Sequence, residues 1–159
     1  MARQLLRLFG GCAVVGGTTS YVSLKLSCYT LHRVEGPSMQ PTLNPTYSYF
    51  QDIVIVKTIT QTKDVDLIPI SAILCLKHPK QEKVYLIKRL IAKQNEDVAQ
   101  RGQLSKTKSM RVPTEHCWVE SDAGPGYLDS SSYLGPISYK KVVGQAILVI
   151  WPPQRIKTL

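Results

Sequence analysis

The sequence is poor in cysteine, and its cysteines lack the spacing of a metal site. Four cysteines occur among 159 residues, and no two of them form a CxxC pair, which argues against a zinc site. Cys75 and Cys117 lie in apolar segments, where cysteine is usually a buried thiol, although the two would pair if their strands were neighbours. We therefore expect no metal and no cofactor.

Acidic residues are absent from the sequence before Glu35, and residues 8–24 carry no charge of either sign. As a helix, this uncharged run would be about 25 Å long, whereas the hydrocarbon core of a bilayer is about 30 Å thick. A membrane span must therefore reach about Leu31, with Lys25 extending towards the lipid headgroups. We predict an N-terminal targeting segment and transmembrane helix in residues 1–31.

The charges around this run leave its orientation and its fate open. Basic residues flank it on both sides, so the positive-inside rule gives no membrane orientation. A removed secretory signal peptide is the alternative to an anchor, because a basic N-terminus followed by a short apolar run fits it as well. An arginine-bearing N-terminus without acidic residues is also typical of mitochondrial import.

The sequence after residue 45 lacks long segments with the periodicity of a helix. It contains instead short segments of β-branched and aliphatic residues, separated by polar, turn-rich stretches. These segments are 52–59, 71–77, 84–92, 117–121 and 142–151. We predict a mainly β fold with a single domain over residues 32–159, whose last strand ends at the double proline after Trp151.

The formal net charge is +9, so an anionic partner such as phospholipid or nucleic acid is compatible with the composition. The cations are scattered along the chain, and they do not alternate with aromatic residues as they do on an RNA-binding strand. We therefore expect no nucleic acid as a partner.

One serine stands in a segment with little conformational freedom. Residues 34–45 read VEGPSMQPTLNP, and Pro37, Pro41 and Pro45 restrict the backbone around Ser38. An ordinary surface turn is one interpretation of such a segment. A rigid loop also suits a nucleophile that must be oriented, which makes Ser38 a candidate catalytic residue.

An apolar strand segment contains a lysine that could serve this serine. Strand alternation puts Lys88 on one face with Leu86 and Leu90, and Arg89 on the other. Burial can lower the pKa of a lysine from about 10.4 towards about 7 or 8, where the neutral amine acts as a general base, whereas arginine keeps its proton. Lys88 is the candidate base, and an exposed lysine that protects an edge strand is the alternative.

A Ser-His-Asp triad is a further alternative, but its parts are poorly placed. No GxSxG motif occurs in the sequence. Of the three histidines, His32 adjoins the predicted anchor, His78 precedes a proline in a turn, and His116 begins a strand.

Four short motifs, in this order and spacing, resemble the boxes of the type I signal peptidase family. They are EGPSMQPTL (35–43), YLIKRLIA (85–92), VPTEHCWVESD (112–122) and LDSSSYLGPI (128–137). The resemblance extends from about Val34 to Arg155, and the serine and lysine boxes are specific when they occur together.

This resemblance implies a membrane anchor followed by a signal-peptidase-like catalytic β-domain. It implies an endopeptidase of the mitochondrial inner membrane that removes presequences from precursor proteins sorted to the intermembrane space and assembles with a sister catalytic subunit. By position, Ser38 matches the nucleophile and Lys88 the general base, with Met39 packed beside them and the Ser38 N–H in the oxyanion hole. Gly36 stands where many members place a second hydroxyl, so oxyanion binding would rest on the backbone and water.

The sequence departs from the family pattern in the last two boxes. Ser121 replaces a glycine, and a positive φ there would cost about 1 kcal/mol or more. Tyr127 replaces the hydroxyl residue that usually orients the lysine, and Ser131 replaces the arginine that pairs with Asp129, so we expect Arg89 to take over that pairing. These changes leave open a second interpretation, in which the chain is a non-catalytic member that stabilises a partner protease subunit.

Overall fold

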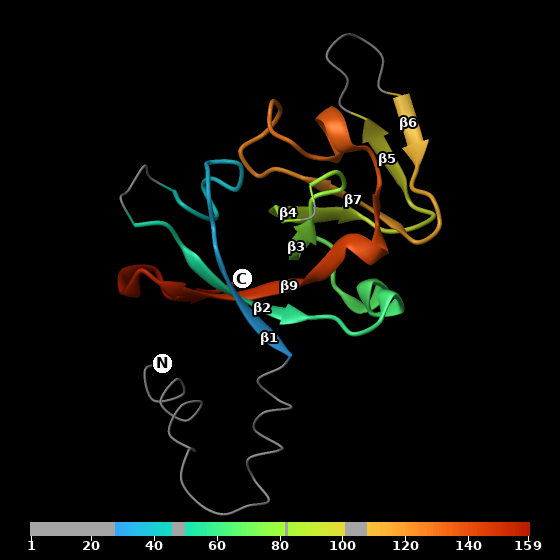
Figure 1. The fold of residues 1–159 in the computed structure, drawn as a ribbon. Helices are drawn as coiled ribbons and strands as arrows, with labels where there is room; N and C mark the ends of the chain where they lie inside the picture. Colours follow the sequence, from blue (N-terminus) through green and yellow to red (C-terminus); the bar gives the residue numbers. More distant parts are fainter. Residues whose placement is uncertain (1–27, 46–49, 82, 101–107) are drawn as a thin grey trace, which may run out of the picture.

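The computed structural model describes residues 28–45, 50–81, 83–100 and 108–159. Its main element is an antiparallel eight-stranded sheet with the order β1-β2-β9-β3-β4-β7-β8, in which β10 pairs with β9, while β5 and β6 form a separate hairpin (Figure 1). The strands are β1 (Tyr29–Arg33), β2 (Ile53–Thr58), β3 (Ile73–Lys77), β4 (Tyr85–Ala92), β5 (Asp97–Gln100), β6 (Lys108–Arg111), β7 (His116–Glu120), β8 (Ile137–Ser138), β9 (Val142–Trp151) and β10 (Lys157–Thr158). Short helical turns lie between them: η1 (Thr62–Leu67), η2 (Ser130–Leu134), η3 (Tyr139–Lys141) and η4 (Pro153–Arg155).

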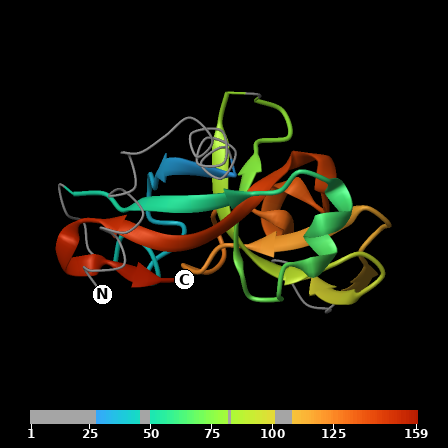
Figure 2. The same cartoon turned by 90° about the horizontal axis from the view of Figure 1, so that it is seen from below.

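Strand β9 joins the two halves of the sheet, because it pairs with β2 along one edge and with β3 along the other. Figure 2 shows it running across the domain beside β2. Its glycine, Gly144, lies directly against β2, and a Cβ at this position would stand 2.1 Å from the carbonyl oxygen of Lys57. Since no side chain fits there, Gly144 is what allows the two strands to approach.

The sheet carries a hydrophobic core on each face. On β3, Leu74 and Leu76 belong to one buried cluster, whereas Ile73 and Cys75 belong to another. The second cluster also takes in Met39 from the segment between β1 and β2. Packing on both faces therefore fixes the position of that segment and of β4, the neighbour of β3, relative to one another.

The mainly β fold is confirmed. The predicted strand 142–151 matches β9, and the other four predicted strands are present with ends shifted by no more than two residues. The sequence does not predict β5 and β6, because their residues are mostly polar and the hairpin lies outside the main sheet. The expected thiols are confirmed as well: Cys75 and Cys117 are free and buried, and β4 separates the strands that carry them.

The predicted end of the membrane span is wrong. Residues Tyr29–Arg33 form β1, in which Leu31 pairs with Ile55 of β2, so a helical span cannot extend to Leu31. In the described part of the chain, the sheet already includes Tyr29. Residues 1–27, which make up the rest of the predicted anchor, lie outside the described residues, and the described part of the chain contains no helix long and apolar enough to cross a membrane.

Candidate active site

Ser38 lies in a segment, residues 34–45, whose two ends are hydrogen-bonded to each other and to the start of β2. The Asn44 side chain donates to the Val34 carbonyl at 2.8 Å and accepts from the Asp52 N–H at 2.8 Å, and the Asp52 carboxylate accepts from the Asn44 N–H at 2.9 Å. Met39, next to Ser38, is 1% exposed. Ser38 itself is partly exposed, so this segment presents its hydroxyl from a fixed frame.

Lys88 lies on β4 with only 3% of its surface exposed, so the interpretation of Lys88 as an exposed edge lysine is wrong. It pairs in register with Leu74 of β3, and burial lowers its pKa to about 8. The carboxylates of Asp129 and Asp122 act in the opposite direction and limit the decrease of the pKa. Above a pH of about 8, the side chain is a neutral amine with a lone pair available to accept a proton.

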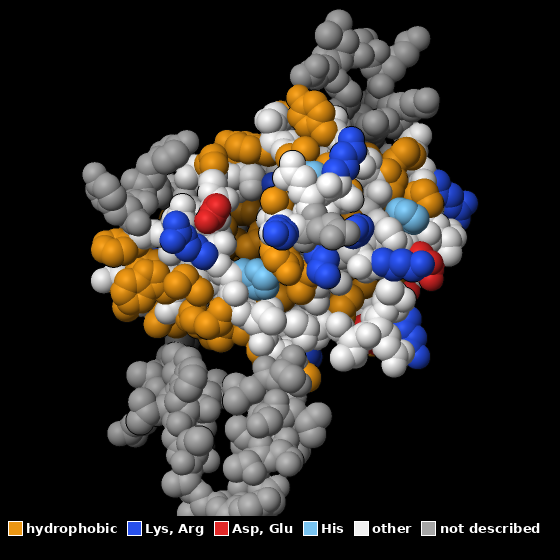
Figure 3. All heavy atoms as spheres, viewed as in Figure 1, with side chains coloured by type: hydrophobic (Ala, Val, Ile, Leu, Met, Phe, Trp, Pro, Cys, Tyr) orange, Lys and Arg blue, Asp and Glu red, His pale blue; other side chains and the backbone are white. Residues whose placement is uncertain are grey.

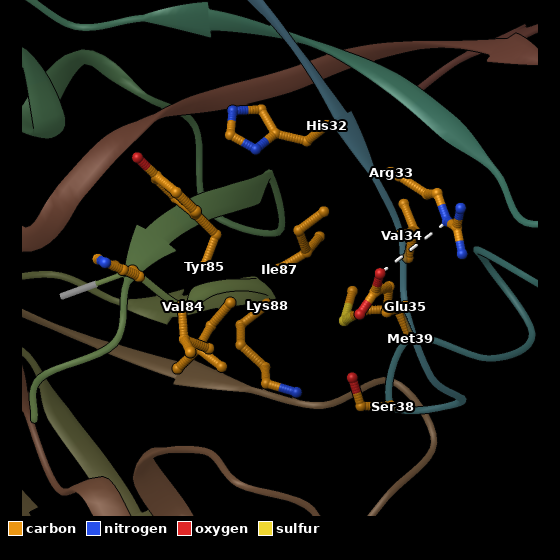
Figure 4. A pocket seen from close by; sticks show the side chains of 12 residues that line it. His32, Arg33, Val34, Glu35, Ser38, Met39, Val84, Tyr85, Ile87 and Lys88 are labelled. Atoms are coloured by element: carbon orange, nitrogen blue, oxygen red, sulfur yellow. Dashed lines mark ion pairs between the residues drawn. The ribbon is translucent and has the colours of Figure 1, made fainter. Parts of the chain in front are cut away.

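Ser38 and Lys88 line the same cavity, which has a volume of about 350 Å³. Figure 4 shows the Lys88 amine and the Ser38 hydroxyl pointing towards one another across it. One wall comes from β1 and the segment that follows it, and the other comes from β4 and the residues just before it. The lining residues are His32, Arg33, Val34, Glu35, Ser38 and Met39 on the first wall and Lys83, Val84, Tyr85, Leu86, Ile87 and Lys88 on the second.

Arg89 pairs with Asp122 and not with Asp129, so the expected ion pair is wrong. Its Nε and Nη2 donate to the two carboxylate oxygens of Asp122 at 2.6 and 2.5 Å, and its Nη1 donates to the Ser71 carbonyl at 2.5 Å. The side chain of Arg89 therefore points towards the residue that follows Ser121, on the face of β4 opposite to that of Lys88.

Asp129 is 1% exposed and is held by N–H and hydroxyl groups instead of a cation. Its Oδ1 accepts from the N–H and hydroxyl of Ser131 at 3.1 and 2.8 Å and from those of Ser132 at 3.1 and 2.9 Å, while Oδ2 accepts from the Ser121 N–H at 3.0 Å. Burial alone would raise its pKa, but these hydrogen bonds hold the pKa below its usual value. Ser121 is not among the residues with positive φ in the described part of the chain, so the strain considered for this position is absent.

The structure places His32 in the cavity, although the sequence suggested a position outside the site. Figure 4 shows it at the end away from Ser38, where its ring lies 5.1 Å from that of Tyr85. The alternation of His32 with Val34, the residue that follows β1, could have predicted this position. The other two histidines do not line the cavity, and neither does Tyr127, which stands where the resemblance expects a hydroxyl that orients the lysine.

Comparison of the sequence with known proteins finds relatives that share one family name. No family model matches the chain. The Danio rerio protein named mitochondrial inner membrane protease subunit 2 is 36% identical over 124 residues, which cover 77% of this chain and 64% of that protein. The Mus musculus protein of the same name is 36% identical over 128 residues, covering 80% and 70%. A Xenopus tropicalis protein named mitochondrial inner membrane protease subunit 1 is 30% identical over 118 residues, covering 74% and 66%. The chain thus spans about two thirds of the length of these relatives.

Proposed function

Because the chain belongs to the mitochondrial inner membrane protease family, we propose that it is a membrane-bound serine endopeptidase that removes sorting presequences from proteins delivered to the mitochondrial intermembrane space. The observation that carries this proposal is the orientation of the Ser38 and Lys88 side chains towards one another in one cavity. A serine nucleophile with a lysine base is an established variant of acyl-transfer catalysis.

In the proposed reaction, the neutral Lys88 amine takes the proton of the Ser38 hydroxyl as the Ser38 oxygen bonds to the scissile carbonyl carbon. The carbonyl oxygen becomes negative, and the Ser38 backbone N–H is suited to donate to it. Lys88 then gives the proton to the leaving amine, which departs and leaves an acyl-enzyme. Water, deprotonated by Lys88, hydrolyses this ester. Gly36, at φ 77°, adds no hydroxyl, so water completes the oxyanion contacts.

The cavity walls favour an extended peptide as the substrate. Within the described residues, β1 pairs with β2 along one edge only, and β7 pairs with β4 only from Arg89 onwards. The free edge of β1 and the Tyr85–Lys88 part of β4 therefore carry backbone N–H and C=O groups that are available beside the cavity. A substrate chain can add to such an edge as a further strand, which would bring its scissile bond to Ser38.

An exposed apolar surface supports action at a membrane. The rings of Phe50 and Trp151 lie 6.1 Å apart, and the two residues are 59% and 41% exposed. Figure 3 shows apolar side chains gathered on the side of the domain where β9 ends and η4 follows. A patch of this kind marks an interaction surface. We assign it to the inner membrane, with the domain facing the intermembrane space and a sister protease subunit as the partner of the complex.

A serine-directed activity probe tests the proposal on the full chain inserted in membranes. Wild-type protein should be labelled at Ser38, and Ser38→Ala should lose the label and slow presequence cleavage at least about a thousandfold. The Ser38→Ala variant should still fold, because the change is small and lies in a loop. Ser109→Ala, which alters an exposed serine of β6, is the control and should behave as the wild type.

The competing function is a non-catalytic subunit that stabilises a partner protease, and the departures at Tyr127 and Ser131 favour it. This function predicts that the wild-type chain stays unlabelled in the assembled complex. It also predicts normal presequence processing by Ser38→Ala, a result that would remove the catalytic proposal.

A further inference from the structure

The residue after β7 carries a buried hydroxyl that makes no hydrogen bond of good geometry among the described residues. Ser121 is 9% exposed, and its Oγ is buried. Its own N–H is bound to the Asp129 carboxylate at 3.0 Å, so the backbone at this position is held in place. A buried polar group left without a partner costs about 1 to 3 kcal/mol, and such a group in a folded protein calls for an explanation.

Strand register places this hydroxyl beside Lys88. Strands β4 and β7 are antiparallel, and Arg89 stands opposite Glu120. Continued by one step beyond the end of β7, this register would put Lys88 opposite Ser121. Residues opposite each other point to the same face of a sheet, with Cβ atoms about 5 Å apart. The Asp129 carboxylate that holds Ser121 also acts electrostatically on Lys88, which agrees with this placement.

The other serine hydroxyls of the same loop are already engaged. Ser130 Oγ accepts from a backbone N–H of β7 at 3.1 Å. The hydroxyls of Ser131 and Ser132 donate to Asp129 at 2.8 and 2.9 Å. Among the serines between β7 and β8, the Ser121 hydroxyl is thus the one without a hydrogen bond of good geometry within the described residues, although it lies close enough to the Asp129 carboxylate to help lower the pKa of that group.

We propose that the Ser121 hydroxyl is a positioning group for Lys88, and that Ser121 Oγ accepts a hydrogen bond from the Lys88 Nζ once the lysine side chain rotates towards it. This inference rests on the proposed function. A neutral amine has two N–H donors and one lone pair, so a hydrogen bond from one N–H to Ser121 stops rotation of the amine and directs the lone pair to Ser38. After proton transfer, the ammonium makes a stronger, charge-assisted bond to the same oxygen. Ser121 thus serves the base in both charge states without touching the substrate.

Titration of Lys88 in the full chain tests this positioning role directly. The pKa of Lys88 is measured by NMR with isotope-labelled lysine, and kcat and KM are measured against pH for an internally quenched presequence peptide. Ser121→Ala and Ser121→Gly should both lower the pKa of Lys88, because the ammonium loses an acceptor that stabilises it. They should also lower kcat about tenfold while KM stays unchanged.

Ser130→Ala is the matched control, since it removes a buried hydroxyl of the same loop that already has a partner. It should reduce thermal stability and leave the pKa of Lys88 unchanged. An unchanged pKa in both Ser121 variants would overturn the proposal whether or not kcat falls, because a merely structural serine affects folding and not the ionisation of Lys88. An active Lys88→Arg variant would instead remove the proposed function, so the two failures are distinguishable.

Discussion

The guanidinium of Arg89 and the carboxylate of Asp122 form a two-point ion pair beside the candidate base. The Nε–Oδ1 and Nη2–Oδ2 distances are 2.6 and 2.5 Å, and the side chains are 26% and 10% exposed. Arg89 follows Lys88 on β4, and its guanidinium also donates to the Thr42 hydroxyl at 3.2 Å. The loop after β7 donates to the nucleophile segment as well, from Ala123 N–H to a backbone carbonyl at 3.1 Å. These contacts join the three parts of the chain that form the site.

Breaking this ion pair should weaken the fold. We expect Asp122→Asn to lower the free energy of unfolding by about 1 to 3 kcal/mol, because a partly buried guanidinium loses its charged partner. Glu35→Gln is the control for stability, since its pair with Arg33 is 3.9 Å long and the side chains are 67% and 77% exposed. It should change stability by less than about 0.5 kcal/mol. Chemical denaturation measures the free energy of unfolding of the two variants, and equal effects would contradict a special role for the pair with Arg89.

Burial of Lys88 should cost the folded protein stability at neutral pH. The pKa is about 8 against a usual value of 10.5, and each pH unit of difference corresponds to about 1.36 kcal/mol, so the cost below pH 8 reaches about 3 kcal/mol. Between about pH 8 and 10.5 the unfolded chain binds more protons than the folded one, so stability rises with pH and the cost disappears above this range. Lys88→Met should therefore be more stable than the wild type at pH 7, although it should not cleave substrate.

Denaturation of the wild type and Lys88→Met at a series of pH values from about 6 to 10 measures this cost. The difference in the free energy of unfolding should be largest at the acid end and should shrink above about pH 8. Lys77→Met, which alters an exposed lysine at the end of β3, controls for the general loss of one charge. A difference that stays constant over the whole range would show that Lys88 titrates as an ordinary lysine.

Gly144 should tolerate no side chain. Its missing Cβ would lie 2.1 Å from the Lys57 carbonyl oxygen and 2.8 Å from the Thr58 Cα, and both are backbone atoms that cannot rotate away. Gly144→Ala should lower the free energy of unfolding by at least about 2 kcal/mol, which corresponds to a loss of several degrees in Tm. Gln145→Ala, on the same strand but half-buried, should have a much smaller effect. Similar melting curves for the two variants would mean that β2 and β9 are further apart than described.

The boundary of the β-domain can be tested by truncation. A chain that begins at Cys28 keeps β1, which covers the outer edge of β2, and it should fold and remain soluble in mild detergent. A chain that begins at Val34 lacks β1, so the β2 backbone becomes an open edge that can pair with other molecules. We expect the shorter chain to aggregate in gel filtration. If both chains behave alike, β1 does not belong to the folded domain.

Strands β2, β3, β4, β7 and β9 and the burial of Lys88 could be predicted, because they follow from the apolar character and side-chain alternation of single segments. Strand β1 could not be predicted, since the hydropathy of its residues does not separate an edge strand from the end of a membrane span. The ion-pair partner of Arg89 depends on which aspartate lies on the same face of β4 as Arg89. The conformation of the loop after β7 decides between Asp122 and Asp129, and the sequence does not show it. The position of Ser121 relative to Lys88 likewise depends on the register between β4 and β7, which the sequence alone does not predict.

If Lys88 is the general base, kcat/KM should rise with pH through an apparent pKa near the value of about 8 that burial produces. The direction follows from the reaction, because only the neutral amine can accept the proton of Ser38. Lys88→Arg keeps the charge but cannot release a proton, so it should be as inactive as Lys88→Ala, whereas Lys77→Arg should retain full activity. Presequence cleavage by the purified, detergent-solubilised full chain, measured from about pH 6 to 10, provides the test. An active Lys88→Arg protein with an unchanged pH profile would exclude Lys88 as the base. The histidine of the cavity, His32, lies at the end away from Ser38 (Figure 4). It could not replace Lys88 as the base without a rearrangement of β1.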